Sequence, residues 1–302
     1  MSAPAPFGPE LFRPDAISPE IAAFNADIEA RVAVGQPLPR ATDVAAMATE
    51  RQIPGPSGEV GIRVIVPEVV RGVYMYMHGG QWVGGSASGA DGRNERLARN
   101  AQVAVVSVDY RLAPDHPYPA APDDCEAVAL WLAQHARAEF GAERLVIGGE
   151  SAGGQLAAVT LVRLRTRHGA MPFAGAVLNY GAFDLAGTPS LRNWGERRLP
   201  LNPAWMRQAT DMFAPPEIQL DPDVSPLYAD LSGMPPALFT QGTVDPYLDD
   251  GLFMYMRWVA AGNEAELAVY PGGIHTFLNY ATELSQAALA RIQRFVTHAV
   301  SG

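Results

Sequence analysis

The chain has 302 residues, of which 48% are hydrophobic, and its formal net charge at neutral pH is −10. This composition is sufficient for one large core, and α/β domains of this size often do not divide. The longest apolar runs fall short of the about 18 residues of a membrane span. Every basic residue is an arginine and the arginines form no stripe, so nucleic acid is not an expected partner.

The N-terminal ten residues contain neither a basic nor an apolar stretch, so we predict no secretory signal and a cytoplasmic location. The single cysteine, Cys125, cannot form an internal disulfide, and we interpret it as a small buried or half-buried residue. The run Arg163–Arg167 near the end of a predicted helix is interpreted as favourable charge on the helix dipole.

Taken in chain order, the pattern begins with an amphipathic helix over 19–34, with Ser18 as its N-cap and Gly35 as its stop. Two short runs around Pro54–Gly58 predict a hairpin. Six later apolar runs are typical of buried parallel strands: Gly72–His78, Val103–Asp109, Leu145–Ile147, Gly175–Asn179, Ala237–Thr240 and Ala265–Tyr270. The predicted helices that alternate with them are Gly92–Asn100, Pro122–Ala136, Ala152–Arg167, Leu248–Ala261 and Thr282–His298.

This alternation predicts an α/β fold with a mostly parallel central sheet of about eight strands and helices on both faces. We expect residues 1–302 to form a single domain. Segment 184–222 breaks the alternation, because it carries bulky apolar side chains and several prolines but no strand pattern. Such insertions usually form a cap, so we predict cap elements in 184–222 and in about 1–48.

The stretch Gly149-Glu-Ser-Ala-Gly153 is a G-x-S-x-G motif between a predicted strand and a predicted helix. A serine on such a sharp turn has its hydroxyl lifted clear of the sheet, and the Ala152 N–H points toward the charge that develops in acyl transfer. A serine nucleophile needs a base, and the base needs a carboxylate that fixes its tautomer. In this fold the chain order is serine, acid, histidine. We therefore predict Ser151 as the nucleophile.

Of the six histidines, only His275 lies in a loop after the last predicted strand, where the sheet edge places active sites. We predict His275 as the base. The predicted acid is Asp245, which follows the strand Ala237–Thr240. We interpret Asp249 and Asp250, one turn further on, as favourable charge at a helix N-terminus.

Several separated motifs follow one another along the chain. In these motifs and their order, the sequence resembles the hormone-sensitive lipase family of α/β hydrolases, the bacterial family IV carboxylesterases. The resemblance runs from about Gly72 to the C-terminus. The motifs that carry it are His78–Trp82, Asp109–Ala120, Gly149–Gly154, Asp223–Leu227, Asp245–Asp250 and Gly272–His275. Asp245 stands at the position that the acid occupies in this family. The resemblance also implies that Asp109, Tyr110 and Arg111 brace the His78 loop from behind.

The resemblance and the glycine-rich loop together predict an oxyanion hole formed by the backbone N–H groups of Gly79, Gly80, Gln81 and Ala152. Gln81 departs from the family, which has glycine or another small residue there. Glu150 departs mildly as well, and we interpret it as structural. No metal and no organic cofactor is required. The candidate lining of the substrate pocket is Trp82, Tyr180, Trp194, Trp205, Met206, Phe213, Tyr247 and Ile274.

The predicted activity is a serine carboxylesterase that acts on small-molecule esters with short acyl groups through an acyl-enzyme. Two alternatives stay open: an amidase or arylformamidase with the same triad, and a non-catalytic small-molecule receptor. The resemblance also implies a homodimer, and the predicted edge strand Ala265–Tyr270 is one place where two copies can pair.

Overall fold

The computed structural model describes residues 12–39, 47–197 and 199–301. Eight strands form one sheet in the order β1-β2-β4-β3-β5-β6-β7-β8. The strands are β1 (Ala48–Gly55), β2 (Gly58–Ile65), β3 (Gly72–Met77), β4 (Val103–Asp109), β5 (Leu145–Glu150), β6 (Phe173–Asn179), β7 (Ala237–Val244) and β8 (Ala265–Ile274). β1 and β2 form the predicted hairpin and pair antiparallel, and β2 is antiparallel to β4. The other neighbours are parallel.

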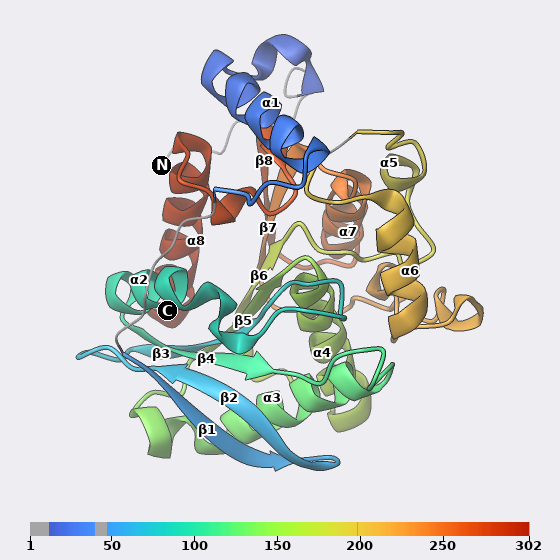
Figure 1. Ribbon diagram of the computed structural model, residues 1–302. Coiled ribbons are helices and arrows are strands. Elements are labelled where there is room, and N and C mark those ends of the chain that lie inside the picture. The colour runs from blue at the N-terminus through green and yellow to red at the C-terminus, as the bar shows by residue number, and fades with distance from the viewer. Residues whose placement is uncertain (1–11, 40–46, 198, 302) are drawn as a thin grey trace.

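Helices cover both faces of this twisted sheet (Figure 1). The main helices are α2 (Asp91–Ala101), α3 (Ala120–Phe140), α4 (Ala152–His168), α7 (Leu248–Ala260) and α8 (Glu283–Ser301). Helices α2 and α8 contact each other and share one face, whereas α3, α4 and α7 lie on the other. The buried apolar side chains accordingly form two large clusters. The predicted fold class, a mostly parallel sheet of about eight strands between helices, is confirmed.

Several predicted elements were too short, among them α3, β5, β7 and β8. Helix α3 runs beyond the predicted Ala136, because the next residues continue a helical pattern until Gly141, whose positive φ of 72° ends the helix. Strand β5 extends past the predicted Ile147 to Glu150. It therefore reaches the residue that precedes Ser151, which ties the serine directly to the centre of the sheet.

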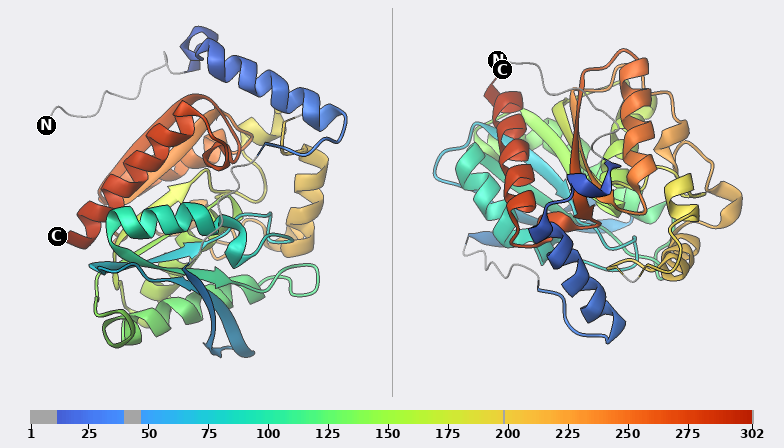
Figure 2. Two further views of the ribbon diagram at one scale, coloured as in Figure 1. Left: turned by 60° about the vertical axis from the view of Figure 1, so that its left-hand side comes forward. Right: turned by 90° about the horizontal axis from the view of Figure 1, so that it is seen from above.

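The helix predicted near the N-terminus is α1 (Pro19–Ala33), which lies outside the sheet beside the β8 edge (Figure 2). Ser18 is the N-cap of this helix, as predicted, because its hydroxyl accepts a hydrogen bond from the Ile21 N–H at 3.2 Å. The Asn25 amide donates to the Gly272 carbonyl at 2.8 Å and attaches α1 to the end of β8. The remainder of the predicted N-terminal cap element, residues 1–11 and 40–46, lies outside the described residues.

Segment 184–222 contains α5 (Pro189–Arg192) and α6 (Pro203–Phe213), and its described residues include no strand. Both helices lie on the α7 side of the molecule (Figure 1). Asn202 caps α6 by accepting hydrogen bonds from the N–H groups of Ala204 and Trp205. The segment thus has helical structure of its own, packed near the carboxyl ends of the central strands.

The interpretation of Arg163 as a helix-dipole cation was wrong. Its side chain is only 1% exposed, and the guanidinium forms ion pairs with Asp223 at 2.6 Å, Asp123 at 2.8 Å and Glu126 at 3.1 Å. A buried cation requires such partners, because burial without them is costly. Arg163 therefore joins α3, α4 and the segment that follows 184–222.

Candidate active site

Ser151 lies on the sharp turn between β5 and α4, with backbone dihedral angles φ of 55° and ψ of −120°. Such a left-handed conformation is costly for a residue with a side chain and is held by its surroundings. A Cβ at Gly149 would lie 2.3 Å from the Gly153 carbonyl, so the close approach of strand and helix requires glycine. The Ser151 N–H donates to the Asn179 carbonyl at 3.0 Å.

The structure brings the three predicted triad residues together. His275 Nε2 lies 2.9 Å from Ser151 Oγ, and His275 Nδ1 lies 2.9 Å and 3.0 Å from the two Asp245 carboxylate oxygens. Asp245 follows β7 and His275 follows β8, so parallel neighbouring strands deliver both side chains to one sheet edge. The three residues are at most 3% exposed. This arrangement can pass a proton from the serine hydroxyl to the imidazole.

The loop after β3 carries three of the four predicted oxyanion donors, and the fourth, Ala152, begins α4. Gly79 approaches so closely that a Cβ there would lie 3.3 Å from the Ser151 Cβ. In the described part of the chain, the backbone N–H groups of Gly79, Gly80, Gln81 and Ala152 have no hydrogen-bond partner. The side-chain amide of Gln81 is bonded to the Tyr247 hydroxyl, at 2.9 Å from Nε2 and 3.1 Å from Oε1. Gln81, where the sequence departs from the family, thus joins this loop to the residues after β7.

His78 and Tyr110 hold the same loop from behind. Their rings are stacked with centroids 4.2 Å apart, and the Tyr110 hydroxyl donates to the His78 carbonyl at 2.7 Å. Burial lowers the pKa of His78 from its ordinary 6.5, so its imidazole is neutral at pH 7. Asp109 holds the far end of this loop by accepting from the Ala87 N–H, whereas Arg111 pairs with Asp124 of α3. Only Tyr110 of the three residues expected to brace the loop has a hydrogen bond to His78.

Glu150, adjacent to Ser151, is an ionised carboxylate in the protein interior. It accepts hydrogen bonds from the hydroxyls of Tyr76 at 2.9 Å and Tyr180 at 2.7 Å, and Arg93 lies 3.0 Å away. Burial raises the pKa of Glu150, but the Arg93 charge and these hydrogen bonds overcome burial and lower the pKa to about 2. The contacts support its interpretation as structural.

Arg93 was missed by our sequence analysis. It lies on α2 with two other arginines, Arg96 and Arg99, and nothing local distinguishes it from them. Its guanidinium also donates to the Tyr76 hydroxyl at 2.7 Å and to the Asn279 side-chain oxygen at 2.6 Å. Only its burial beside Glu150 marks Arg93 as part of the site.

The predicted pocket residues have different surroundings. Trp82 is buried, stacks on Phe213 at 4.7 Å and donates its ring N–H to the Gln155 side chain. The Tyr180 and Tyr247 rings each pack edge-on against His275. The remaining members divide by exposure: Met206, Ile274 and Trp194 are buried, whereas Trp205 is 44% exposed. Trp194 and Asp245, the predicted acid, line the same cavity of about 310 Å³.

Asp249 and Asp250 do lie in the first turn of α7, but a helix-dipole role does not describe Asp250. Its carboxylate is buried and accepts hydrogen bonds from the N–H groups of Phe183 and Asp184 and from the Thr188 hydroxyl. Burial raises the pKa of Asp250 to about 8, against the effect of these hydrogen bonds. Asp250 therefore fastens the start of segment 184–222 to α7.

Comparisons with known proteins place this site in a family. Residues 74–279 match the family described as the alpha/beta hydrolase fold. The chain is 35% identical to carboxylic ester hydrolase LipN of Mycobacterium tuberculosis over 246 residues, which cover 76% of this chain and 64% of LipN. It is 30% identical to an acetyl esterase of Salmonella paratyphi A over 247 residues, 78% of this chain and 74% of that enzyme.

Among solved structures, the hyperthermophilic esterase of the archaeon Pyrobaculum calidifontis superposes with a TM-score of 0.80 at 30% identity, covering 97% of this chain and 98% of that one. The chain therefore belongs to the α/β hydrolase fold family, as a member of its hormone-sensitive lipase branch. The predicted family and the predicted enzyme class, carboxylic ester hydrolase, are confirmed. Within the described ranges, no helix has the length and apolar character needed to cross a membrane.

Proposed function

We propose that the protein is a serine carboxylesterase that hydrolyses short-chain acyl esters through an acyl-enzyme. The observation that carries this proposal is the hydrogen-bonded series from Ser151 Oγ through the His275 ring to Asp245. With its proton on Nδ1 and donated to Asp245, the imidazole presents Nε2 as an acceptor for the serine proton. The neutral ring is then a base within hydrogen-bond reach of a nucleophile.

In the first half-reaction Ser151 Oγ attacks the ester carbonyl while His275 takes its proton and then transfers it to the departing alcohol. The unpartnered N–H groups of Gly79, Gly80, Gln81 and Ala152 hold the oxyanion of the tetrahedral intermediate. In the second half-reaction His275 takes a proton from water, which attacks the acyl carbon. His275 then returns that proton to Ser151 Oγ as the bond to the acyl carbon breaks and the acid leaves. Each step uses only groups of this chain and water.

Two observations support short acyl groups. Ser151 is only 3% exposed, so its hydroxyl does not lie on an open surface. One relative, 30% identical over 247 residues, is named an acetyl esterase. The single domain, the caps at 1–48 and 184–222, the homodimer and the cytoplasmic location stay predictions.

The test is hydrolysis of p-nitrophenyl esters from acetate to palmitate by the wild type and by Ser151→Ala. We expect activity to peak at short chains and kcat to fall by roughly 10⁶-fold in the variant, because triad members act as a unit. Unchanged thermal unfolding of Ser151→Ala is the control for folding. Full activity in that variant would overturn the mechanism, and activity confined to matched nitroanilides or formanilides would favour the amidase alternative.

A further inference from the structure

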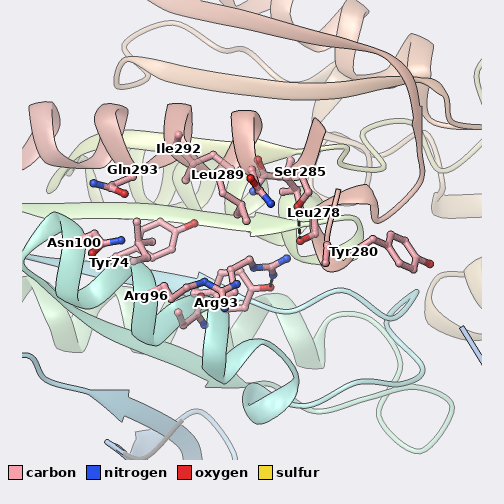
Figure 3. Close-up of a pocket in the computed structure, with 17 residues that line it drawn as sticks. Tyr74, Arg93, Arg96, Asn100, Leu278, Tyr280, Ser285, Leu289, Ile292 and Gln293 are labelled. Carbon is pink, nitrogen blue, oxygen red and sulfur yellow. Dashed lines mark hydrogen bonds between the residues drawn. The ribbon is translucent and has the colours of Figure 1, made fainter. Parts of the chain in front are cut away.

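A cavity of about 470 Å³ lies between α2 and α8, over the sheet face that these helices cover (Figure 3). Its volume is in the range of small-molecule sites. Its apolar part is formed by leucine and isoleucine side chains, which include Leu97, Leu278, Leu289 and Ile292. Ser151, His275 and Asp245 are not among the residues that line it, although Tyr76 and Arg93, which contact Glu150, are. The cavity therefore lies behind the candidate triad and not at it.

A glycine in the sheet, Gly148, makes room for the Tyr74 side chain at one wall of this cavity. Gly148 of β5 stands in register with Tyr76 of β3 and Val177 of β6, on the face toward α2 and α8. A Cβ at Gly148 would lie 2.3 Å from the Tyr74 hydroxyl oxygen. The Tyr74 side chain therefore leans over Gly148, and its hydroxyl points into the space between the two helices (Figure 3).

Two polar atoms of the lining lack partners. Asn179 is 5% exposed, and its side-chain Oδ1 has no hydrogen-bond partner among the described residues. The Tyr74 hydroxyl likewise forms no hydrogen bond in the described part of the chain, although the residue lines the cavity. A buried acceptor without a donor is costly, so these atoms favour an occupant that supplies hydrogen bonds. One acceptor and one hydroxyl fit a group that both donates and accepts.

The charges around the cavity favour a neutral occupant. Arg93 lines the wall, but its guanidinium is already paired with Glu150 and bonded to Tyr76 and Asn279. Arg96, the other arginine of the lining, is engaged as well. Glu150 does not line the cavity, and its charge compensates that of Arg93. A charged occupant would therefore lose its hydration without gaining a free counter-charge from this pair, whereas a neutral molecule does not meet this penalty.

We propose that this cavity binds a small neutral alcohol or phenol. The ligand hydroxyl accepts a hydrogen bond from Tyr74 and donates one to Asn179 Oδ1, and its ring or alkyl body lies against Leu278, Leu289 and Ile292. Apolar cavities of this kind bind small aromatic molecules, and the two polar atoms add selectivity for a hydroxyl group. The site lies behind the nucleophile turn, since the Asn179 carbonyl accepts the Ser151 N–H.

The proposal is tested by calorimetric titration of the wild type, Tyr74→Phe and Leu289→Trp with phenol, toluene and benzoate. We expect Tyr74→Phe to weaken phenol binding by about 3- to 10-fold, the value of one neutral hydrogen bond, and to leave toluene binding unchanged. Leu289→Trp fills the cavity and should abolish the binding of both. Benzoate should bind the wild type at least about tenfold more weakly than phenol, because its charge would be desolvated without a free counter-charge from the Arg93–Glu150 pair.

Three results would overturn the proposal. Absence of saturable phenol binding to the wild type would mean that the cavity holds water only. Phenol binding unaffected by both substitutions would place the ligand elsewhere, the active site included. Tighter binding of benzoate than of phenol would exclude a neutral ligand class. Crystals of the wild type soaked in 4-bromophenol locate the bromine by anomalous scattering, so the test does not depend on the folding of either variant.

Discussion

Two buried carboxylates lie on opposite sides of the candidate triad and differ in charge. Glu150 precedes Ser151 at the end of β5, and its pKa is lowered to about 2. Asp250 lies in the first turn of the helix that follows Asp245, and its pKa is raised to about 8. Burial raises the pKa of both groups. Only Glu150 has a cation, Arg93, within 3.0 Å, whereas the three groups that donate to Asp250 are neutral.

This difference shows that neutral hydrogen bonds do not by themselves keep a buried carboxylate ionised here, but a paired arginine does. The support behind Ser151 is thus an ion pair that persists over the whole physiological pH range. The attachment of segment 184–222 depends on a group that changes charge near neutrality. The predictions below separate these two kinds of attachment.

The largest effect is expected from Arg93→Met, which leaves Glu150 buried without its counter-charge. We expect the free energy of unfolding to fall by about 3–5 kcal/mol at pH 7, as measured by urea denaturation. Arg99→Met on the same helix is the matched control, because that exposed pair with Glu95 is worth at most about 1 kcal/mol. Equal losses in the two variants would show that Arg93 does not stabilise Glu150.

A smaller effect is expected from Asp250→Ala, which leaves two N–H groups and the Thr188 hydroxyl without their acceptor. We expect a loss of about 2–4 kcal/mol at pH 6, by the same denaturation. Asp250→Asn retains an acceptor and a polar partner for Thr188, so its loss should stay below about 1 kcal/mol. If the asparagine variant is as unstable as the alanine variant, the charge of Asp250 matters more than its hydrogen bonds.

The pH dependence should distinguish the two carboxylates. The pKa of Asp250 rises from its ordinary 3.8 to about 8, so the folded state binds the extra proton in this interval. Wild-type stability relative to Asp250→Asn should therefore fall as the pH rises from about 4 to about 8. The pKa of Glu150 lies below its ordinary 4.5, so its contribution is present above that pH and lost as the pH falls through about 2. A constant difference between wild type and Asp250→Asn from pH 5 to 9 would contradict this account.

The smallest effects are expected from removing one hydroxyl donor from each of the two buried carboxylates, Glu150 and Asp250. Tyr180→Phe deletes a donor to the ionised Glu150, and we expect it to cost about 1.5–3 kcal/mol. Thr188→Val deletes a donor to Asp250, which is protonated at pH 6, and should cost about 0.5–1.5 kcal/mol. Denaturation of both variants at pH 6 gives the comparison, and the reverse order would be inconsistent with different charges on the two carboxylates.

Much of the fold and the centre of the site could be predicted because their signals are local. Alternating apolar strands and amphipathic helices predicted the eight-stranded sheet, which is confirmed. The turn around Ser151 has a local signature, since glycines at 149 and 153 permit the close approach of strand and helix. Asp245 and His275 were predicted by their order and by their places after strands, because parallel strands end at one sheet edge.

The charges and spaces around that centre were decided only by the tertiary structure. Arg93 and Glu150 lie on different elements, so no local pattern pairs them, and the same holds for Asp250 and the backbone of Phe183. The cavity between α2 and α8 likewise depends on Gly148 and Tyr74 from different strands. The physical reason is that burial and the charge of neighbouring groups are set by packing between distant segments, and these two quantities determine which groups are ionised and where a ligand fits.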